Sequence, residues 1–303
     1  MRRTSRVPSS TWRGPRPGGT TPARHHRQDG CMVTSLPLRD GRSIPAVGFG
    51  VYKVDDAGAA VAVRTALDAG YRHVDTAEMY GNERGVGEAI RASRLDRDDV
   101  FVTTKVWNDH QGRDATLRAF DASLDRLGLD AVDLYLIHWP AAANDRYVET
   151  WRTLVELRES GRARSVGVSN FQVPHLERII DETGEVPAVN QVERHPWLPQ
   201  RELMAFHAQH DIVTAAWSPL GRGRLVDEPV LTAIAGAHGV SVAQVLVRWN
   251  VQQGVVVLPK SVTPERIRSN IDVDGFTLSE DDLAAIAGLE SGQRTGSHPD
   301  SVA

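Results

Sequence analysis

The chain has 303 residues, of which 41% are hydrophobic and 24% are charged, and its formal net charge is -4 at pH 7. No apolar run approaches the roughly 18 residues that a membrane helix needs, and the slight negative charge argues against a nucleic-acid-binding body. The length fits either two ordinary domains or one large barrel of about 250 residues.

The N-terminal segment differs in composition from the rest. Residues 1–31 contain seven arginines and one acid, with few large apolar side chains, so we expect a disordered basic extension followed by a single domain over 32–303. A transit peptide and a nucleic-acid-binding arm are alternative interpretations, whereas a secretory signal would need an apolar segment. The lone cysteine, Cys31, excludes an internal disulfide and fits a reducing compartment, so we expect a cytoplasmic protein.

A hairpin is expected at the start of the ordered chain. Residues 33–38 and 43–45 are short extended segments, and the Asp-Gly pair within 39–42 is a common hairpin turn. Such a hairpin would form a lid over the bottom of a barrel. Residues 46–52 follow as a short strand, and the glycines in it allow close approach of a backbone or ligand.

From there, helical and extended patterns alternate. Residues 55–70 and 82–90 show helical spacing, and so do 117–128, 148–161 and 242–249, with Gly70 and Gly128 as predicted helix ends. Strands are expected at 72–75, 100–105, 132–137, 165–169, 189–191, 212–217 and 255–259. Eight strand and helix units in series predict an α/β fold, a (β/α)8 TIM barrel with the N-terminal β-hairpin lid.

Polar residues follow the apolar strands at the ends where a barrel carries its active site. The stretch from Asp75 to Tyr80 places a carboxylate at a strand end and a phenol on the next loop. Each such residue has an ordinary alternative role: Asp75 as a helix cap, and Tyr80 as a residue packed under a loop. The whole set at the strand ends favours a site, and it consists of Asp75, Lys105, His138, Ser169, Asn170, Gln191, Trp217, Ser218, Lys260 and Ser261.

These segments resemble the aldo-keto reductases, in particular the bacterial branch that includes 2,5-diketo-gluconate reductases. The resemblance covers about residues 36–296. It is carried by GFGVYKV from Gly48, GYRHVDTAEMYGNE from Gly70, TTKVWN from Thr103, DLYLIHWP from Asp133, VGVSNF from Val166, NQVERHP from Asn190, AWSPLGRG from Ala216, LPKSVTPERIRSN from Leu258, and the tail motif Arg294-Thr295-Gly296.

The resemblance implies a catalytic tetrad of Asp75, Tyr80, Lys105 and His138 and an NADPH-dependent reduction of aldehydes or ketones, keto-sugars and 2-oxoaldehydes included. Carbonyl reduction needs a hydride for the carbon and a proton for the oxygen. Tyr80 would supply the proton, and the cation of Lys105 would lower the phenol pKa from its usual value near 10. Asp75 would hold that lysine, and neutral His138 would orient the substrate oxygen.

The resemblance also implies where NADPH would lie. Ser169, Asn170 and Gln191 can read a carboxamide, and Trp217 can stack on the nicotinamide ring. The cations and hydroxyl of 260–266 suit a 2′-phosphate, which favours NADPH over NADH. Asn270 would hold the adenine, although Ser269 stands where the family often has glutamate. The full predicted cofactor set is Ser169, Asn170, Gln191, Trp217, Ser218, Leu220, Gly221, Lys260, Ser261, Val262, Thr263, Arg266 and Asn270.

An aromatic cup is expected to form the substrate walls. It would consist of Tyr52, Trp107 and Trp139 around His138, with Asn108 nearby. The cations Arg224, Arg194 and His195 either favour acidic sugars or are solvated charges at the rim. We expect a monomer whose partner is a small carbonyl compound, with no nucleic acid, membrane or metal.

Two other functions stay open at this stage. A Schiff-base lyase would use Lys105 as its nucleophile and would not require Tyr80, Trp217 or the 260–266 segment. A regulatory module would bind NADPH without turnover, and it would not require the complete tetrad.

Overall fold

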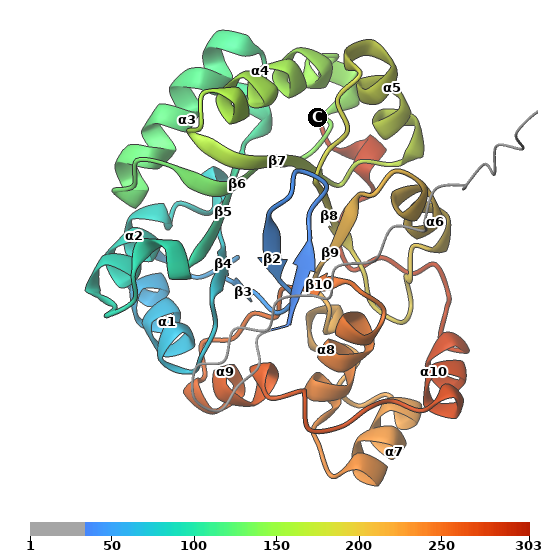
Figure 1. Cartoon of the computed structure of the whole chain (residues 1–303). Coiled ribbons are helices and arrows are strands. Elements are labelled where there is room, and N and C mark those ends of the chain that lie inside the picture. The colour runs from blue at the N-terminus through green and yellow to red at the C-terminus, as the bar shows by residue number, and fades with distance from the viewer. Residues whose placement is uncertain (1–33) are drawn as a thin grey trace, which may run out of the picture.

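The computed structural model describes residues 34–303, so the predictions for residues 1–31 and Cys31 lie outside the described part. Strands β1 (Ser35–Pro37) and β2 (Ser43–Pro45) pair antiparallel, as the Asp-Gly turn predicts. Gly41 in this turn has a φ of 85°, which favours glycine. Ile44 is fully buried in one apolar cluster with Leu134 and Leu136 of the barrel. The hairpin therefore covers one end of the barrel (Figure 1).

Eight parallel strands form the barrel, and each pairs with the next one along the chain. The ring closes between its first and last strands through a parallel bridge from Val47 to Val257, where the Gly48 N–H donates to the Val257 carbonyl at 2.9 Å. The predicted (β/α)8 barrel is confirmed. Its strands are β3 (Phe49–Gly50), β4 (His73–Asp75), β5 (Phe101–Val106), β6 (Val132–Ile137), β7 (Ala163–Ser169), β8 (Val189–Glu193), β9 (Val213–Trp217) and β10 (Val256–Val257).

Helices surround the strands on the outside (Figure 1). The predicted caps are present at α1, where Asp55 accepts a 2.7 Å hydrogen bond from Gly58 N, and at Gly128, which ends α3 in the left-handed conformation. No residue range was predicted for the helices α5, α6, α7, α9 and α10. The helices are α1 (Asp56–Asp68), α2 (Glu83–Ala92), α3 (Arg113–Leu127), α4 (Tyr147–Glu159), α5 (Val173–Thr183), α6 (Arg201–Gln209), α7 (Pro229–His238), α8 (Val242–Gln252), α9 (Pro264–Ile271) and α10 (Glu280–Ala287).

The core fills the space between the strands and the helices. Val63, Phe120 and Trp151 are fully buried there on three different helices. Gly87 lets α2 approach α3 closely, since a Cβ at this position would lie 2.0 Å from the Leu127 carbonyl oxygen. Within residues 34–303, no single helix is long and apolar enough to span a membrane, and α7 with α8 would pass only as a pair bent by 88°.

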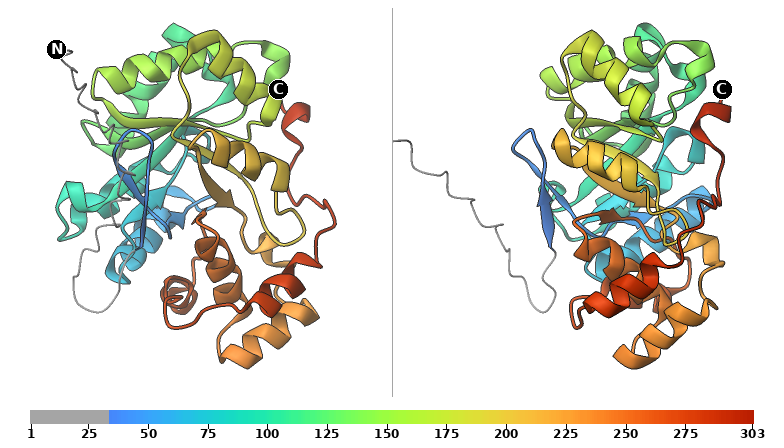
Figure 2. Two further views of the ribbon diagram at one scale, coloured as in Figure 1. Left: turned by 45° about the vertical axis from the view of Figure 1, so that its right-hand side comes forward. Right: turned by 90° about the vertical axis from the view of Figure 1, so that its right-hand side faces the viewer.

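Short 3-10 turns follow several strand ends and shape the mouth of the barrel. The turn η1 (Glu78–Tyr80) carries the predicted tyrosine after β4, and η3 (Asn108–His110) follows β5. The others are η2 (Arg97–Asp99), η4 (Ala142–Asn144), η5 (Gly221–Gly223) and η6 (Pro299–Ser301). The hairpin and the C-terminal segment lie on opposite faces of the barrel (Figure 2). The strand ends and the polar residues that follow them therefore face the C-terminal segment.

Candidate active site

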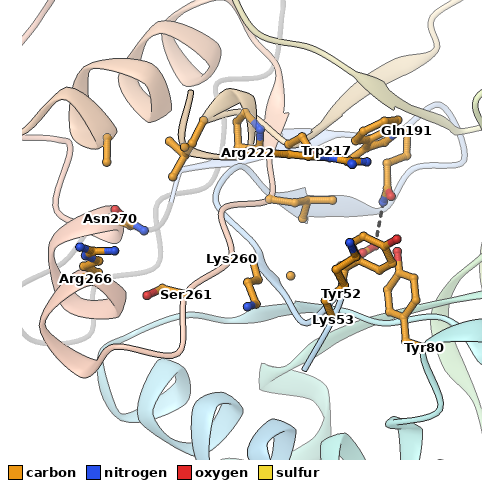
Figure 3. Close-up of a pocket in the computed structure, with 18 of the residues that line it drawn as sticks. Tyr52, Lys53, Tyr80, Gln191, Trp217, Arg222, Lys260, Ser261, Arg266 and Asn270 are labelled. Atoms are coloured by element: carbon orange, nitrogen blue, oxygen red, sulfur yellow. Dashed lines mark hydrogen bonds between the residues drawn. The ribbon is translucent and has the colours of Figure 1, made fainter. Parts of the chain in front are cut away.

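A cavity of about 930 Å³ lies at the carboxyl ends of the barrel strands. It extends from Tyr80 and Tyr52 at one end to Arg266 and Asn270 at the other (Figure 3). Most of the residues that the sequence predicts for the site line it together, although they come from eight different parts of the chain. These are Tyr52, Asp75, Tyr80, His138, Trp139, Ser169, Asn170, Gln191, Trp217, Ser218, Leu220, Lys260, Ser261, Arg266 and Asn270.

A buried ion pair forms the floor of this cavity. Lys105 is fully buried on β5, and its Nζ donates to Asp75 Oδ1 at 2.7 Å and to the Thr76 carbonyl at 2.8 Å. Burial lowers the pKa of Lys105, and the charge of Asp75 opposes that effect. Asp75 is occupied by these contacts and does not cap a helix, so the alternative reading of this residue is wrong.

Tyr80 lies directly above the pair. It stands on η1, and its ring centroid is 5.1 Å from Lys105 Nζ. Burial, followed by the negative charge of Asp75, raises the pKa of the phenol well above its usual value of 10.0. The lowered pKa that we expected from Lys105 is therefore not found, because burial dominates and Asp75 balances the lysine charge. The phenol is protonated at neutral pH and can donate.

His138 follows the last residue of β6 and faces Tyr80. The two ring centroids are 5.6 Å apart, and Trp107 packs edge-on against the histidine at 5.2 Å. Burial, and then the charge of Lys105, lower the pKa of His138 well below 6.5. The imidazole is therefore neutral, and its Nδ1 is buried without a hydrogen-bond partner among the described residues. A neutral ring offers one N–H donor to a substrate oxygen.

A hydrogen-bond network connects the wall residues on β7, β8 and β9. Gln191 Nε2 donates to Asp75 Oδ2 at 2.7 Å, so both oxygens of the Asp75 carboxylate are engaged. Asn170 has a φ of 64°, donates through Nδ2 to the His138 carbonyl at 2.9 Å, and accepts from Trp217 Nε1 at 2.8 Å. The network therefore fixes the indole ring of Trp217 relative to the buried Asp75–Lys105 pair.

The other end of the cavity is cationic. Lys260 and Arg266 are exposed and line it beside Ser261 and Asn270. Arg266 and Asn270 lie on α9, which begins at Pro264. Within residues 34–303, neither cation forms an ion pair, although 14 pairs between a lysine or arginine and a carboxylate occur elsewhere. This end is therefore an open, positively charged surface at a helix start, of the kind that suits an anion.

Some predicted residues lie elsewhere. Arg194 and His195 were expected at the rim, and this is wrong because both are buried. Arg194 stacks on Trp249 at 4.1 Å and donates a hydrogen bond to Asn250. Burial lowers the pKa of Arg194 to about 9. Lys105 lies beneath the cavity surface, and Asn108 faces the C-terminal residue. Trp107, Gly221, Val262 and Thr263 also lie outside the cavity lining.

Twelve residues of the cavity lining were not among the predicted site residues, and three of them change the charge or polarity of the wall. Lys53 and Arg222 add positive charge to the wall, and Met79 adds apolar surface. Lys53 follows Tyr52, Met79 precedes Tyr80 and Arg222 follows Gly221, so each lies within a motif that carries the family resemblance. Lys53 and Arg222 have positive φ values of 57° and 55°, a backbone conformation that no local sequence pattern indicates for these residue types.

Comparison with known proteins agrees with this geometry. A family model described as the aldo/keto reductase family matches residues 46–291. An aldo-keto reductase of Mycobacterium sp. (strain KMS) is 56% identical, covering 87% of this chain and 96% of that protein. A protein of Yersinia pestis named methylglyoxal reductase DkgA is 47% identical, and the match covers 89% of this chain and 97% of that protein.

A solved structure shares the fold as well. It is a mutant of Gox0644 in complex with NADPH, and it matches with a TM-score of 0.86 and 46% identity, covering 89% of this chain and 98% of that one. The family model covers more than half of the chain, and each relative is aligned along nearly its whole length. This chain therefore belongs to the aldo/keto reductase family.

Proposed function

We propose that this chain reduces aldehydes and ketones to alcohols with NADPH, and that Tyr80 protonates the carbonyl oxygen. One observation carries the proposal. The buried Lys105 is held by Asp75 at 2.7 Å and lies 5.1 Å from the ring of Tyr80, at the floor of a cavity large enough for a dinucleotide and a small substrate. The catalytic tetrad is then Asp75, Tyr80, Lys105 and His138.

The residues along the cavity fit NADPH. Lys260 and Arg266 supply positive charge without a protein counter-ion among the described residues, which suits a phosphate monoester. Ser261, next to them, adds a hydroxyl, and Trp217 at the opposite end offers an aromatic face. When bound, NADPH would supply the hydride for the carbonyl carbon.

The chain's own residues would handle the proton and the substrate oxygen. The neutral Tyr80 phenol donates its proton to that oxygen, and the charge of Lys105 stabilises the phenolate left behind. His138, neutral because of burial, donates an N–H to the same oxygen and fixes its position. Tyr52 and Trp139 cover the site and exclude water.

The two other functions fit the geometry less well. A Schiff-base lyase needs a free amine at the cavity surface, but Lys105 is fully buried and bonded to Asp75 and the Thr76 carbonyl. A module that only binds NADPH would not need the acid, lysine and histidine to converge on Tyr80. The aromatic rings of Tyr52 and Trp139 in the cavity wall and the name of the Yersinia pestis relative favour 2-oxoaldehydes and aromatic aldehydes as first substrates to test.

We expect the purified protein to consume NADPH with at least one of methylglyoxal, an aromatic aldehyde and a keto-sugar. Tyr80→Phe should lower kcat about 10³-fold because it deletes only the proton donor. The Kd for NADPH should stay within about twofold of the original value, since the ring is retained. Steady-state kinetics and a fluorescence titration with NADPH measure the two quantities.

Tyr135→Phe is the matched control. Its hydroxyl is buried in the core without a partner among the described residues, so its removal should leave kcat unchanged. Turnover by Tyr80→Phe at the level of the unmodified protein would refute the assignment of the acid. Tight NADPH binding without consumption, with every carbonyl compound tested, would favour the binding module.

A further inference from the structure

The C-terminal segment crosses the mouth of the barrel. We call residues 291–303 the C-terminal strap. At its start, the backbone N–H groups of Ser291 and Gly292 donate to the Trp197 carbonyl at 3.1 and 2.9 Å. At its end, the Ala303 carbonyl accepts from Asn108 Nδ2 at 3.0 Å. Figure 2 shows the strap on the face opposite the hairpin. The proposed reaction leaves the tail motif at its centre without a role.

A buried carboxylate holds the centre of the strap. Glu193, the last residue of β8, is 1% exposed and accepts 2.5 Å hydrogen bonds from both the backbone N–H and the hydroxyl of Thr295. Gly296 N donates to both carboxylate oxygens at 3.2 Å, and His195 Nε2 lies 3.0 Å from Oε1. Burial raises the pKa of Glu193, but these hydrogen bonds outweigh it and lower the pKa to about 2. The anchor is therefore an ionised carboxylate at neutral pH.

The strap rests on the edge of Trp217 at the same point. A Cβ at position 296 would lie 2.5 Å from Cη2 of Trp217, so only glycine fits against the ring without a shift. The opposite side of the indole is held by its hydrogen bond to Asn170. Trp217 is thus held between a wall residue and the strap, and its remaining surface lines the cavity.

We propose that Glu193 is a positioning residue: it fixes the strap at Thr295 and Gly296, and the strap locks Trp217 in the orientation that receives the cofactor. The inference rests on the proposed function, because it assigns Trp217 to NADPH. A tryptophan has two rotatable side-chain bonds, and ordering it only when the cofactor arrives would cost affinity. Glu193 therefore contributes to NADPH binding although it does not line the cavity.

Two variants break the arrangement at different points. Glu193→Gln keeps the size of the side chain but exchanges an ionised acceptor for a neutral amide, and Gly296→Ala keeps Glu193 but pushes a methyl group into Trp217. We expect each variant to raise the Kd for NADPH about tenfold. This corresponds to the free energy of ordering one side chain or of losing one charged hydrogen bond. The KM for NADPH should rise with the Kd, while kcat does not fall, because the tetrad is untouched.

The matched controls are Glu156→Gln and Gly236→Ala. Glu156 forms an exposed pair with Arg113, and a Cβ at Gly236 on α7 meets nothing within 4 Å. Both should bind NADPH as the unmodified protein does. If Glu193→Gln does not fold, Thr295→Val, which removes one of the two Thr295 donors, and Gly296→Ala carry the test.

A lowered melting temperature with an unchanged Kd and KM for NADPH in Glu193→Gln or in its substitutes would overturn the proposal, because Glu193 would then only support the fold. Weaker binding in these variants and not in the controls supports it. The proposed function is judged separately on the unmodified protein: if that protein neither binds nor consumes NADPH, the function itself fails.

Discussion

At the end of the cavity near Tyr80, Lys105 is fully buried and already paired with Asp75, whereas at the other end Arg266 and Lys260 are exposed and form no ion pair within residues 34–303. The difference fits the roles proposed for the two groups of charges. A cation that stabilises a transient phenolate must be held in place before the reaction, and the protein supplies its counter-ion. A cation that recognises a phosphate receives its counter-ion from the ligand, so it is exposed to solvent until the ligand binds.

The largest expected difference between the two ends of the cavity is the effect of a substitution on turnover. Asp75→Asn should lower kcat about 10²-fold, because burial then lowers the pKa of Lys105 without the opposing charge of Asp75, and a neutral amine does not stabilise the Tyr80 phenolate. The Kd for NADPH should change little, and steady-state kinetics with a fluorescence titration measure both. Asp121→Asn, which breaks the exposed pair with Arg162, is the control and should keep its kcat. A kcat within twofold in Asp75→Asn would contradict the role of the buried pair.

A smaller effect is expected at the cationic end, and on binding alone. Arg266→Ala should weaken NADPH binding about tenfold and leave NADH binding unchanged, because only the 2′-phosphate would lose a partner. Arg268→Ala removes an exposed arginine from the same helix that does not line the cavity, so its Kd should match the unmodified protein. Equal losses for NADPH and NADH, measured by titration, would show that Arg266 does not read that phosphate.

The smallest effect concerns stability against pH. His73, two residues before Asp75 on β4, is buried, and burial lowers its pKa from 6.5 to about 4. The unfolded chain therefore binds a proton first as the pH falls, so stability is full above pH 6.5 and declines toward pH 4. One such histidine should lower the free energy of unfolding by about 0.7 kcal/mol when the pH falls from 7 to 6.

Urea denaturation at the two pH values measures this cost. His73→Gln should make the pH dependence shallower by that amount, whereas Arg266→Ala should leave it unchanged, since Arg266 is exposed. The same slope in His73→Gln and the unmodified protein would place the acid sensitivity elsewhere, for example at His207, whose pKa burial lowers to about 3.

The sequence predicts the barrel and most of the cavity lining because strand ends carry local signals. An apolar run followed by Asp75 or His138 marks both the strand and the position of the polar group. Arg194 and His195 follow β8 in the same way, but they turn inward to Asn250 and Glu193. Buried arginines are rare, so a sequence pattern places them in solvent. Their partners are set by tertiary packing, which leaves no periodic trace.

Glu193 illustrates the limit more clearly. It belongs to a quoted motif, yet its partners Thr295 and Gly296 are more than 100 positions away, and no local pattern connects them. The expected lowering of the Tyr80 pKa failed for a related reason. The sequence places a lysine near the phenol, but the burial of both groups, and the share of the lysine charge that Asp75 balances, depend on the packed structure.

The placement of the chain ends also bears on how the protein can be handled. Ala303 contacts Asn108 beside the mouth, whereas β1 begins at Ser35 on the opposite face of the barrel (Figure 2). A purification tag or surface linker added after Ala303 would start at the mouth of the barrel, beside Asn108, and disturb the C-terminal strap. An attachment ahead of β1 would leave the mouth of the barrel pointing away from a solid support. The side of the hairpin is therefore the preferable point of attachment for immobilised assays.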